Sequence, residues 1–228
     1  MTQLNPSIVN IPMPGTIAML PIGPNGYPVP WFVSWIDSDG RPVASDTADA
    51  KPEFRCADGR KWVRAVKEKL CWVCGTKLEP EFTFPIGPMC SINQVTAEPP
   101  CHNECAEYSV RACPFLTRPD MTRRDNNLPE DTTEAGLMIM RNPGVTCLWT
   151  CNSYQLFPDG SGSYLIRLPN PSRVKWYAQG RPALRHEIEA SVTTGLCTLE
   201  DMARQQSPDA MLDLHRSLVR ARKRFPAD

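Results

Sequence analysis

The sequence predicts an α+β fold, with helices and strands in separate stretches of the chain. Residues 58–70 place apolar side chains four apart on one face of an otherwise basic segment, which is typical of a surface helix. Residues 136–178 consist of short apolar and β-branched runs separated by turn residues, which is typical of antiparallel strands. Helical periodicity returns from residue 185 onward. We therefore expect a β-rich C-terminal half, residues 136–228, that ends in helices.

The overall composition gives no support for a nucleic-acid partner, a membrane partner or export. The chain has 228 residues, and its 25 basic residues balance 25 acidic ones, so no global field favours a nucleic acid or a membrane. The first fifteen residues lack the basic start and apolar run of a signal peptide, and no apolar stretch is long enough to span a bilayer. We expect a cytoplasmic protein with no membrane partner. Ten cysteines in a reducing compartment then indicate metal binding or buried thiols.

The first segment, residues 1–54, is rich in proline and glycine, and we expect an extended arm with a strand at 31–36, where the sequence reads WFVSWI. Asp58 follows this segment and can cap a helix that runs to Leu70. That helix delivers the chain to Cys71.

A β-hairpin is the simplest account of residues 75–100, because aromatic residues alternate with polar ones and a Gly-Pro pair marks a turn (Phe82, Phe84, Gly87 and Pro88). A short helix follows near residue 102, and Pro114 is expected to end it. Residues 117–135 are polar and charged, and we expect an exposed loop there that separates the two halves of the chain.

The C-terminal half contains five strand-like runs, which read LMIM, VTCLWT, YQLF, YLIRL and RVKWY. Asp159-Gly160 predicts a hairpin between the third run and the fourth. Helices are expected over 185–192, with a stop at Gly195, over 199–204, and over 210–224, where one face is apolar and the other basic.

Four residues within 55–116 have the spacing of a zinc site. Cys71 and Cys74 are followed by Gly75, which lets a tight turn present two thiolates to one ion. His102 and Cys105 lie three apart at the expected start of a helix, so their side chains share one face. A knuckle, a hairpin and ligands from a first helical turn make the arrangement called a treble clef. We expect Zn²⁺ to fold residues 55–116 into a treble-clef-like module.

The sequence leaves alternatives open around this site. Cys101 is adjacent to His102 and could replace it as the fourth ligand. Other cysteines could form a second metal site, although buried thiols are the simpler explanation (Cys90, Cys113, Cys147 and Cys151).

Four protein ligands leave zinc no open position for water, so the predicted role of the metal is structural. Nucleases of the HNH family also use a treble clef, but their general-base histidine lies in the hairpin, and residues 75–100 contain no histidine. His186 and His215 are the other two histidines, and both belong to the C-terminal half. The sequence therefore identifies no catalytic residue.

Basic clusters offer the only local surfaces for phosphates. They are the basic face of the last helix and three arginines at 118–124, where acidic residues are interleaved.

Several runs resemble a family of uncharacterised proteins from bacteria and their phages, over about residues 28–202. The runs are CWVCG, FPIGPMC, PPCHNECAEYSVRACPFL and WYAQGRPALRHEI. The resemblance supports the zinc site as a unit and implies no activity. We therefore expect a zinc-stabilised, non-enzymatic binding protein that contacts nucleic acid or a host protein. The alternative is a nuclease or nucleotide-modifying enzyme with a site between the two halves.

Overall fold

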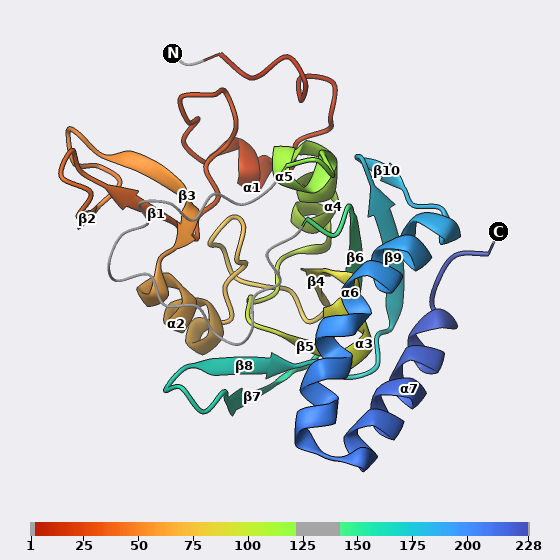
Figure 1. Ribbon diagram of the computed structural model, residues 1–228. Coiled ribbons are helices and arrows are strands. Elements are labelled where there is room, and N and C mark those ends of the chain that lie inside the picture. Colours follow the sequence, from red (N-terminus) through yellow and green to blue (C-terminus); the bar gives the residue numbers. More distant parts are fainter. Residues whose placement is uncertain (1–2, 122–141, 228) are drawn as a thin grey trace.

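The computed structural model describes residues 3–121 and 142–227 (Figure 1). These residues form helices and antiparallel sheets, which confirms the α+β class. None of the described helices combines the length and apolarity that a membrane crossing requires.

A four-stranded antiparallel sheet lies at the centre, in the order β10–β9–β6–β4. Its strands are β4 (Phe82–Ile86), β6 (Val145–Cys151), β9 (Arg173–Ala178) and β10 (Arg181–Pro182). Strand β4 comes from residues 55–116, the predicted zinc-binding segment, whereas the other three come from the C-terminal half. The two segments therefore share one sheet.

The two faces of this sheet are covered by different helices (Figure 1). Side chains alternate between the faces along each strand. One face carries Phe84, Trp149 and Trp176 into the main core, together with helices α3 (Pro88–Asn93), α6 (Arg185–Gln206) and α7 (Pro208–Arg222). The other face contributes Leu148 to a second core, on which helices α4 (Asn103–Ala112) and α5 (Pro114–Thr117) lie.

Two smaller sheets and two further helices complete the fold. One sheet has the order β2–β1–β3, and the other has the order β5–β8–β7. The elements not yet given are α1 (Gly15–Ala18), β1 (Val33–Ile36), β2 (Pro42–Val43), β3 (Lys51–Ala57), α2 (Gly59–Glu68), β5 (Val95–Thr96), β7 (Gln155–Pro158) and β8 (Tyr164–Arg167). The predicted cap of α2 is confirmed, since the Asp58 side chain accepts a hydrogen bond from the Arg60 N–H. The predicted hairpin is also confirmed, because β7 pairs with β8 around Asp159 and Gly160.

The expected hairpin within residues 75–100 is wrong. Strand β4 pairs with β6, and the chain after it enters helix α3. Pro88 stands at the first position of α3, where its fixed φ favours a helix and its missing N–H costs nothing. A proline that looks like a turn residue thus begins a helix.

Two further expectations need correction, those for Gly195 and for the N-terminal segment, whereas the end expected at Pro114 is confirmed. Helix α6 is continuous through Gly195, which is buried inside the helix and does not end it. Pro114 does end α4, but it also begins α5 directly. The N-terminal segment is no free arm, because Ile8 and Ile17 are buried in the second core. Residues 122–135 of the predicted loop and the expected strand at 137–140 lie outside the described residues.

Truncation of Phe84 tests the main core. Phe84 is 1% exposed and packs edge-on against Phe82 and Tyr154. We expect Phe84→Ala to lower the free energy of unfolding by about 3–5 kcal/mol, because it leaves a cavity in the core. Leu156→Ala, at a position that is 41% exposed on β7, should cost less than about 1 kcal/mol. Urea denaturation measures both, and equal losses would contradict this description of the core.

Candidate metal centre

The first ligand pair lies in a tight turn between the two residues of an antiparallel bridge, Leu70 and Lys77. The Cys71 N–H donates to the carbonyl of Thr76 at 2.7 Å, and the Gly75 N–H donates to the carbonyl of Cys71 at 2.8 Å. Gly75 has a φ of 76°, a left-handed conformation that glycine adopts without strain. The turn closes for this reason and presents Cys71 and Cys74 from the same side.

The second ligand pair is positioned by strand β4. Cys101 forms a backbone bridge with Thr83, through two hydrogen bonds of 2.8 and 2.9 Å. His102 then serves as the N-terminal cap of α4, and Cys105 lies in the first turn of that helix. The His102 N–H points at Cys71, with 3.4 Å between the nitrogen and the sulfur. The sheet thus brings the start of α4 against the knuckle.

All four predicted ligands converge. Their ligand atoms lie within 4.8 Å of one another, with 3.5 Å between Cys74 Sγ and His102 Nδ1 and 3.8 Å between Cys105 Sγ and His102 Nδ1. Ligands placed tetrahedrally around zinc, at about 2.0–2.3 Å from the ion, lie about 3.3–3.8 Å apart. The four residues are also buried. The cluster is therefore compatible with one enclosed metal ion.

Neighbouring groups fix the orientation of the ligands. His102 Nε2 lies 2.9 Å from the carbonyl oxygen of Lys77, so Nε2 carries the proton and Nδ1 is free to bind a metal. Hydroxyl groups lie close to two sulfurs, at 3.2 Å for Thr76 and Cys74 and 3.7 Å for Thr16 and Cys105. Thr16 belongs to α1, so the N-terminal segment also supports the site.

Hydrogen bonds between the thiols hold protons inside the cluster, and a bound cation could take the place of these protons. Burial raises the pKa of Cys71, but hydrogen bonds from the Cys105 and Cys74 side chains and from the backbone N–H groups of Cys74 and His102 outweigh burial and lower it below its usual range. The hydrogen bond that Cys105 donates to Cys71 raises the pKa of Cys105, and burial adds to this rise. A divalent cation would displace these protons and hold the sulfurs as thiolates.

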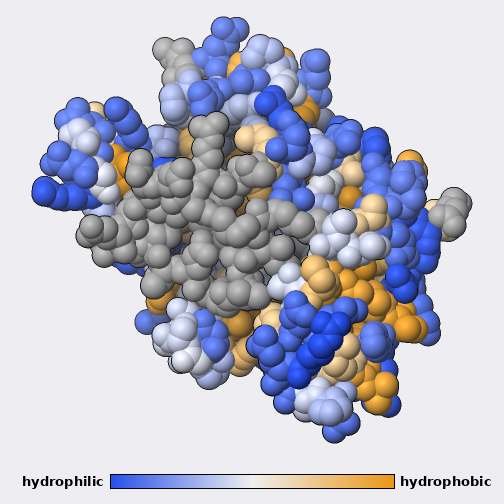
Figure 2. Space-filling view, viewed as in Figure 1, coloured by the Kyte–Doolittle hydropathy of each residue, from blue (hydrophilic) through white to orange (hydrophobic). Residues whose placement is uncertain are grey.

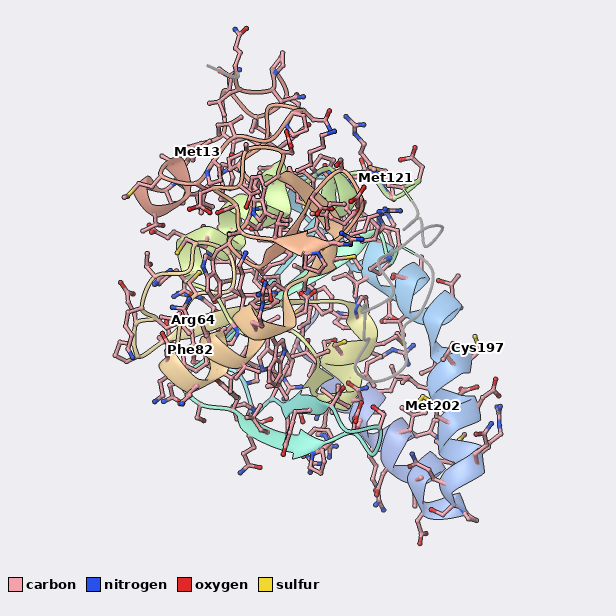
Figure 3. The ribbon with its side chains drawn as sticks, turned by 90° about the vertical axis from the view of Figure 1, so that its left-hand side faces the viewer. Met13, Arg64, Phe82, Met121, Cys197 and Met202 are labelled. Atoms are coloured by element: carbon pink, nitrogen blue, oxygen red, sulfur yellow. The ribbon has the colours of Figure 1, made fainter. Side chains whose placement is uncertain are left out.

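Cys101 lies outside the cluster. Its thiol donates to the carbonyl of Thr83 at 3.3 Å, and burial raises its pKa. Among residues 3–121 and 142–227, the four predicted ligands form the only group of this kind, so the second site that the sequence left open is not formed there (Cys90, Cys113, Cys147 and Cys151). Cys197 is exposed on α6, away from α4 (Figure 3).

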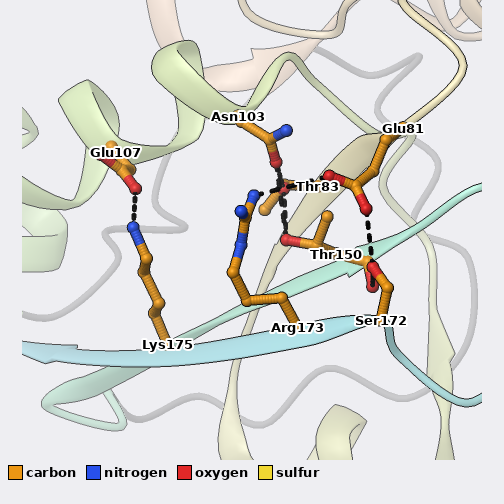
Figure 4. A network of polar contacts seen from close by, with 8 residues as sticks. All are labelled: Glu81, Thr83, Asn103, Glu107, Thr150, Ser172, Arg173 and Lys175. Atoms are coloured by element: carbon orange, nitrogen blue, oxygen red, sulfur yellow. Dashed lines mark hydrogen bonds and ion pairs between the residues drawn. The ribbon is translucent and has the colours of Figure 1, made fainter.

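A polar network that the sequence reasoning missed joins helix α4 to the central sheet (Figure 4). The Asn103 side chain accepts a short hydrogen bond from Thr83, and Thr83 lies 2.9 Å from the hydroxyl of Thr150 on the next strand. Glu107 forms an ion pair with Lys175 on β9. Three further residues interact on the same side of the sheet: Glu81 accepts a hydrogen bond from Ser172 and forms an ion pair with Arg173. Threonines between apolar strand residues were the signal in the sequence.

Gly75 also connects the knuckle to helix α2. A Cβ atom at Gly75 would lie 2.6 Å from the ring of Trp31, so this ring packs directly on the turn. The Trp31 ring also contacts two basic side chains: Lys61 Nζ lies 5.9 Å from the ring centroid, and Arg64 Cζ lies 5.7 Å from it. Trp31 therefore transmits the position of the knuckle to two basic side chains of α2.

Two serine substitutions distinguish the ligands from their neighbour. We expect Cys105→Ser to lose the bound metal, because it removes a thiolate from the cluster. Cys101→Ser should keep one ion per chain, since a hydroxyl can still donate to the Thr83 carbonyl. Elemental analysis of the dialysed proteins measures this difference. Loss of metal in Cys101→Ser alone would assign the fourth ligand to Cys101.

Two alanine substitutions isolate the contact between Gly75 and Trp31. Gly75→Ala combines a left-handed φ with the 2.6 Å approach to the ring, and we expect a loss of stability above about 2 kcal/mol. Gly40 has a similar φ of 80° but open space around it, so Gly40→Ala should cost only the strain, about 1 kcal/mol. Equal losses in urea denaturation would show that the ring contact contributes nothing.

Comparison with known proteins found no matching family model, no matching curated protein and no matching solved structure. The resemblance to bacterial and phage proteins therefore stays a hypothesis based on the motifs, and the interpretation of the site depends on its geometry.

Proposed function

We propose that this protein is a zinc-stabilised nucleic-acid-binding protein, in which a treble-clef-like module presents the basic helix α2. The observation that carries the proposal is the packing of Trp31 on the knuckle at Gly75, beneath Lys61 and Arg64. Binding of a metal at the knuckle would then order the basic surface.

The donor set supports zinc as the metal. Three thiolates and one imidazole match the ligands of structural zinc sites, and their burial leaves no open position for substrate. A knuckle followed by β4 and by ligands from the first turn of α4 supports the treble-clef-like description. Such a site needs reduced cysteines, which supports the cytoplasm of a bacterium or of a phage-infected cell as its location.

The charge around α2 supports a polyanionic partner. Residues 58–77 contain six basic residues and two acidic ones, an excess of four positive charges in a chain whose total is zero. The basic residues are Arg60, Lys61, Arg64, Lys67, Lys69 and Lys77. Clusters of this kind attract phosphates, and an aromatic ring among them suits a base.

The geometry favours binding over catalysis. The strand residue that faces Asn103 at the start of α4 is Thr83, whose hydroxyl is a poor general base. His186 and His215 are exposed on α6 and α7, which cover the other face of the sheet. The nuclease or nucleotide-modifying enzyme remains the competing hypothesis.

Neutralisation of two lysines tests the α2 surface. We expect Lys67→Gln with Lys69→Asn to weaken binding of DNA or RNA oligonucleotides and to reduce the slope of log K against log salt by about two. Asparagine suits position 69 because Lys69 has a φ of 52°. The control is Arg41→Gln with Lys51→Gln, which removes two exposed charges from the β1–β3 sheet and should leave binding unchanged. Fluorescence anisotropy at several salt concentrations measures all three proteins.

Other outcomes separate the competing functions. No binding to any DNA or RNA at low salt would remove the nucleic-acid proposal and leave a host protein as the partner. Turnover of nucleic acid or nucleotides by zinc-loaded protein, lost in His186→Ala, would favour the enzyme.

A further inference from the structure

Helix α7 has an exposed apolar face that the fold does not use. Leu218 and Ala221 are buried against the core, whereas Leu212 is 50% exposed and Val219 is 57% exposed. Leu212 and Val219 are seven residues apart, so they lie on one face of the helix. A shallow groove of about 420 Å³ runs along this face (Leu212, His215, Arg216, Val219 and Arg220). Apolar surface gathers over this corner of the molecule (Figure 2).

The charges beside this face are arranged in a definite order. Asp209 and Asp213 lie in the first half of α7, and Arg216 and Arg220 lie in the second half. All four are exposed. They fall on one flank of the stripe formed by Leu212 and Val219, because a helix turns by about 100° per residue. The flank is therefore acidic at one end and basic at the other.

The acidic end of this flank faces the basic end of a second copy when two α7 helices run antiparallel. Residues 209 and 220 are equally far along the helix from the point between Leu214 and His215, and so are residues 213 and 216. A two-fold axis at this point places each aspartate of one helix opposite an arginine of the other. Leu212 and Val219 have nearly the same midpoint, so the apolar side chains meet as well. A parallel two-fold arrangement would instead place the two flanks on opposite sides of the interface, so these charges would not pair.

We infer that α7 is a self-association surface, on which a second copy of this chain docks its own α7 in antiparallel orientation. The pairing is isologous, as in most homodimers, since both copies use the same residues. Each half of the flank supplies the charges that the other half needs, which favours a second copy over an unrelated protein or a nucleic acid.

The contacts within one chain leave these residues available. Arg216 lies 3.2 Å from Asp213, and both side chains are mostly exposed, so exchanging this ion pair for one between chains costs little. Arg222 is directed away from the face, toward Glu189 on α6. One helix of 15 residues offers less area than a standard interface, so we expect a weak dimer, with a dissociation constant of about micromolar.

Charge reversal tests the pairing. We expect Asp209→Arg with Asp213→Arg to make the flank wholly basic, and Arg216→Asp with Arg220→Asp to make it wholly acidic. Each double variant should weaken self-association more than tenfold, because like charges then face each other. A mixture of the two should associate at least as tightly as the unchanged chain, because a basic flank then meets an acidic one.

Sedimentation velocity of zinc-loaded, nuclease-treated protein measures the association, and circular dichroism confirms that each variant is folded. The control is Arg41→Asp with Lys51→Asp, which makes the same change in net charge as Arg216→Asp with Arg220→Asp but away from α7, and it should leave the dimer intact. A monomer at all concentrations, dimers that survive both reversals, or a mixture that stays monomeric would each overturn the inference.

Discussion

The convergence of Cys71, Cys74, His102 and Cys105 is the constraint on which the rest of this half of the molecule depends. The segment between the two pairs holds two short strands, one short helix and many prolines, and its apolar side chains are buried in a core that it shares with the C-terminal half. Ordering such a segment costs conformational entropy at every residue, and local hydrogen bonds recover only part of it. A metal bound only by the folded chain would contribute its binding free energy to folding.

Two sets of contacts connect the cluster to the rest of the fold. Toward the sheet, Asn103 follows a ligand and is held by Thr83, which bonds to Thr150 on the neighbouring strand. Toward the opposite side, Gly75 supports the ring of Trp31, against which α2 places basic side chains. Both paths begin at residues adjacent to ligands. The central sheet and the basic helix are therefore both connected to the four-residue cluster.

The sequence allowed the local features of this arrangement to be predicted, because each of them depends on residues close together in the chain. The ligand pairs are three residues apart, Asp58 caps the helix that follows it directly, and Asp159-Gly160 connects adjacent strands. The errors concern distant partners. Strand β4 pairs with β6, which lies more than fifty residues later, and no local pattern distinguishes this pairing from a hairpin. Gly195 and Pro88 were misjudged because a glycine is tolerated inside a buried helix and a proline is tolerated at the first position of one, so neither residue alone decides where a helix ends.

Net charge illustrates the same limit for function. The total of zero gives no argument for any partner, yet the charges are separated along the chain into a basic cluster at residues 58–77 and an ordered acidic and basic flank on α7. Electrostatic binding depends on this distribution rather than on its sum. Helices α2 and α7 lie well apart in the molecule (Figure 1), so self-association through α7 would leave the basic helix α2 of each copy exposed. Two linked basic surfaces bind a polyanion more tightly than one surface does, because the second contact is made at high effective concentration. The weak pairing proposed for α7 and the modest charge of α2 would then reinforce each other on a single nucleic acid.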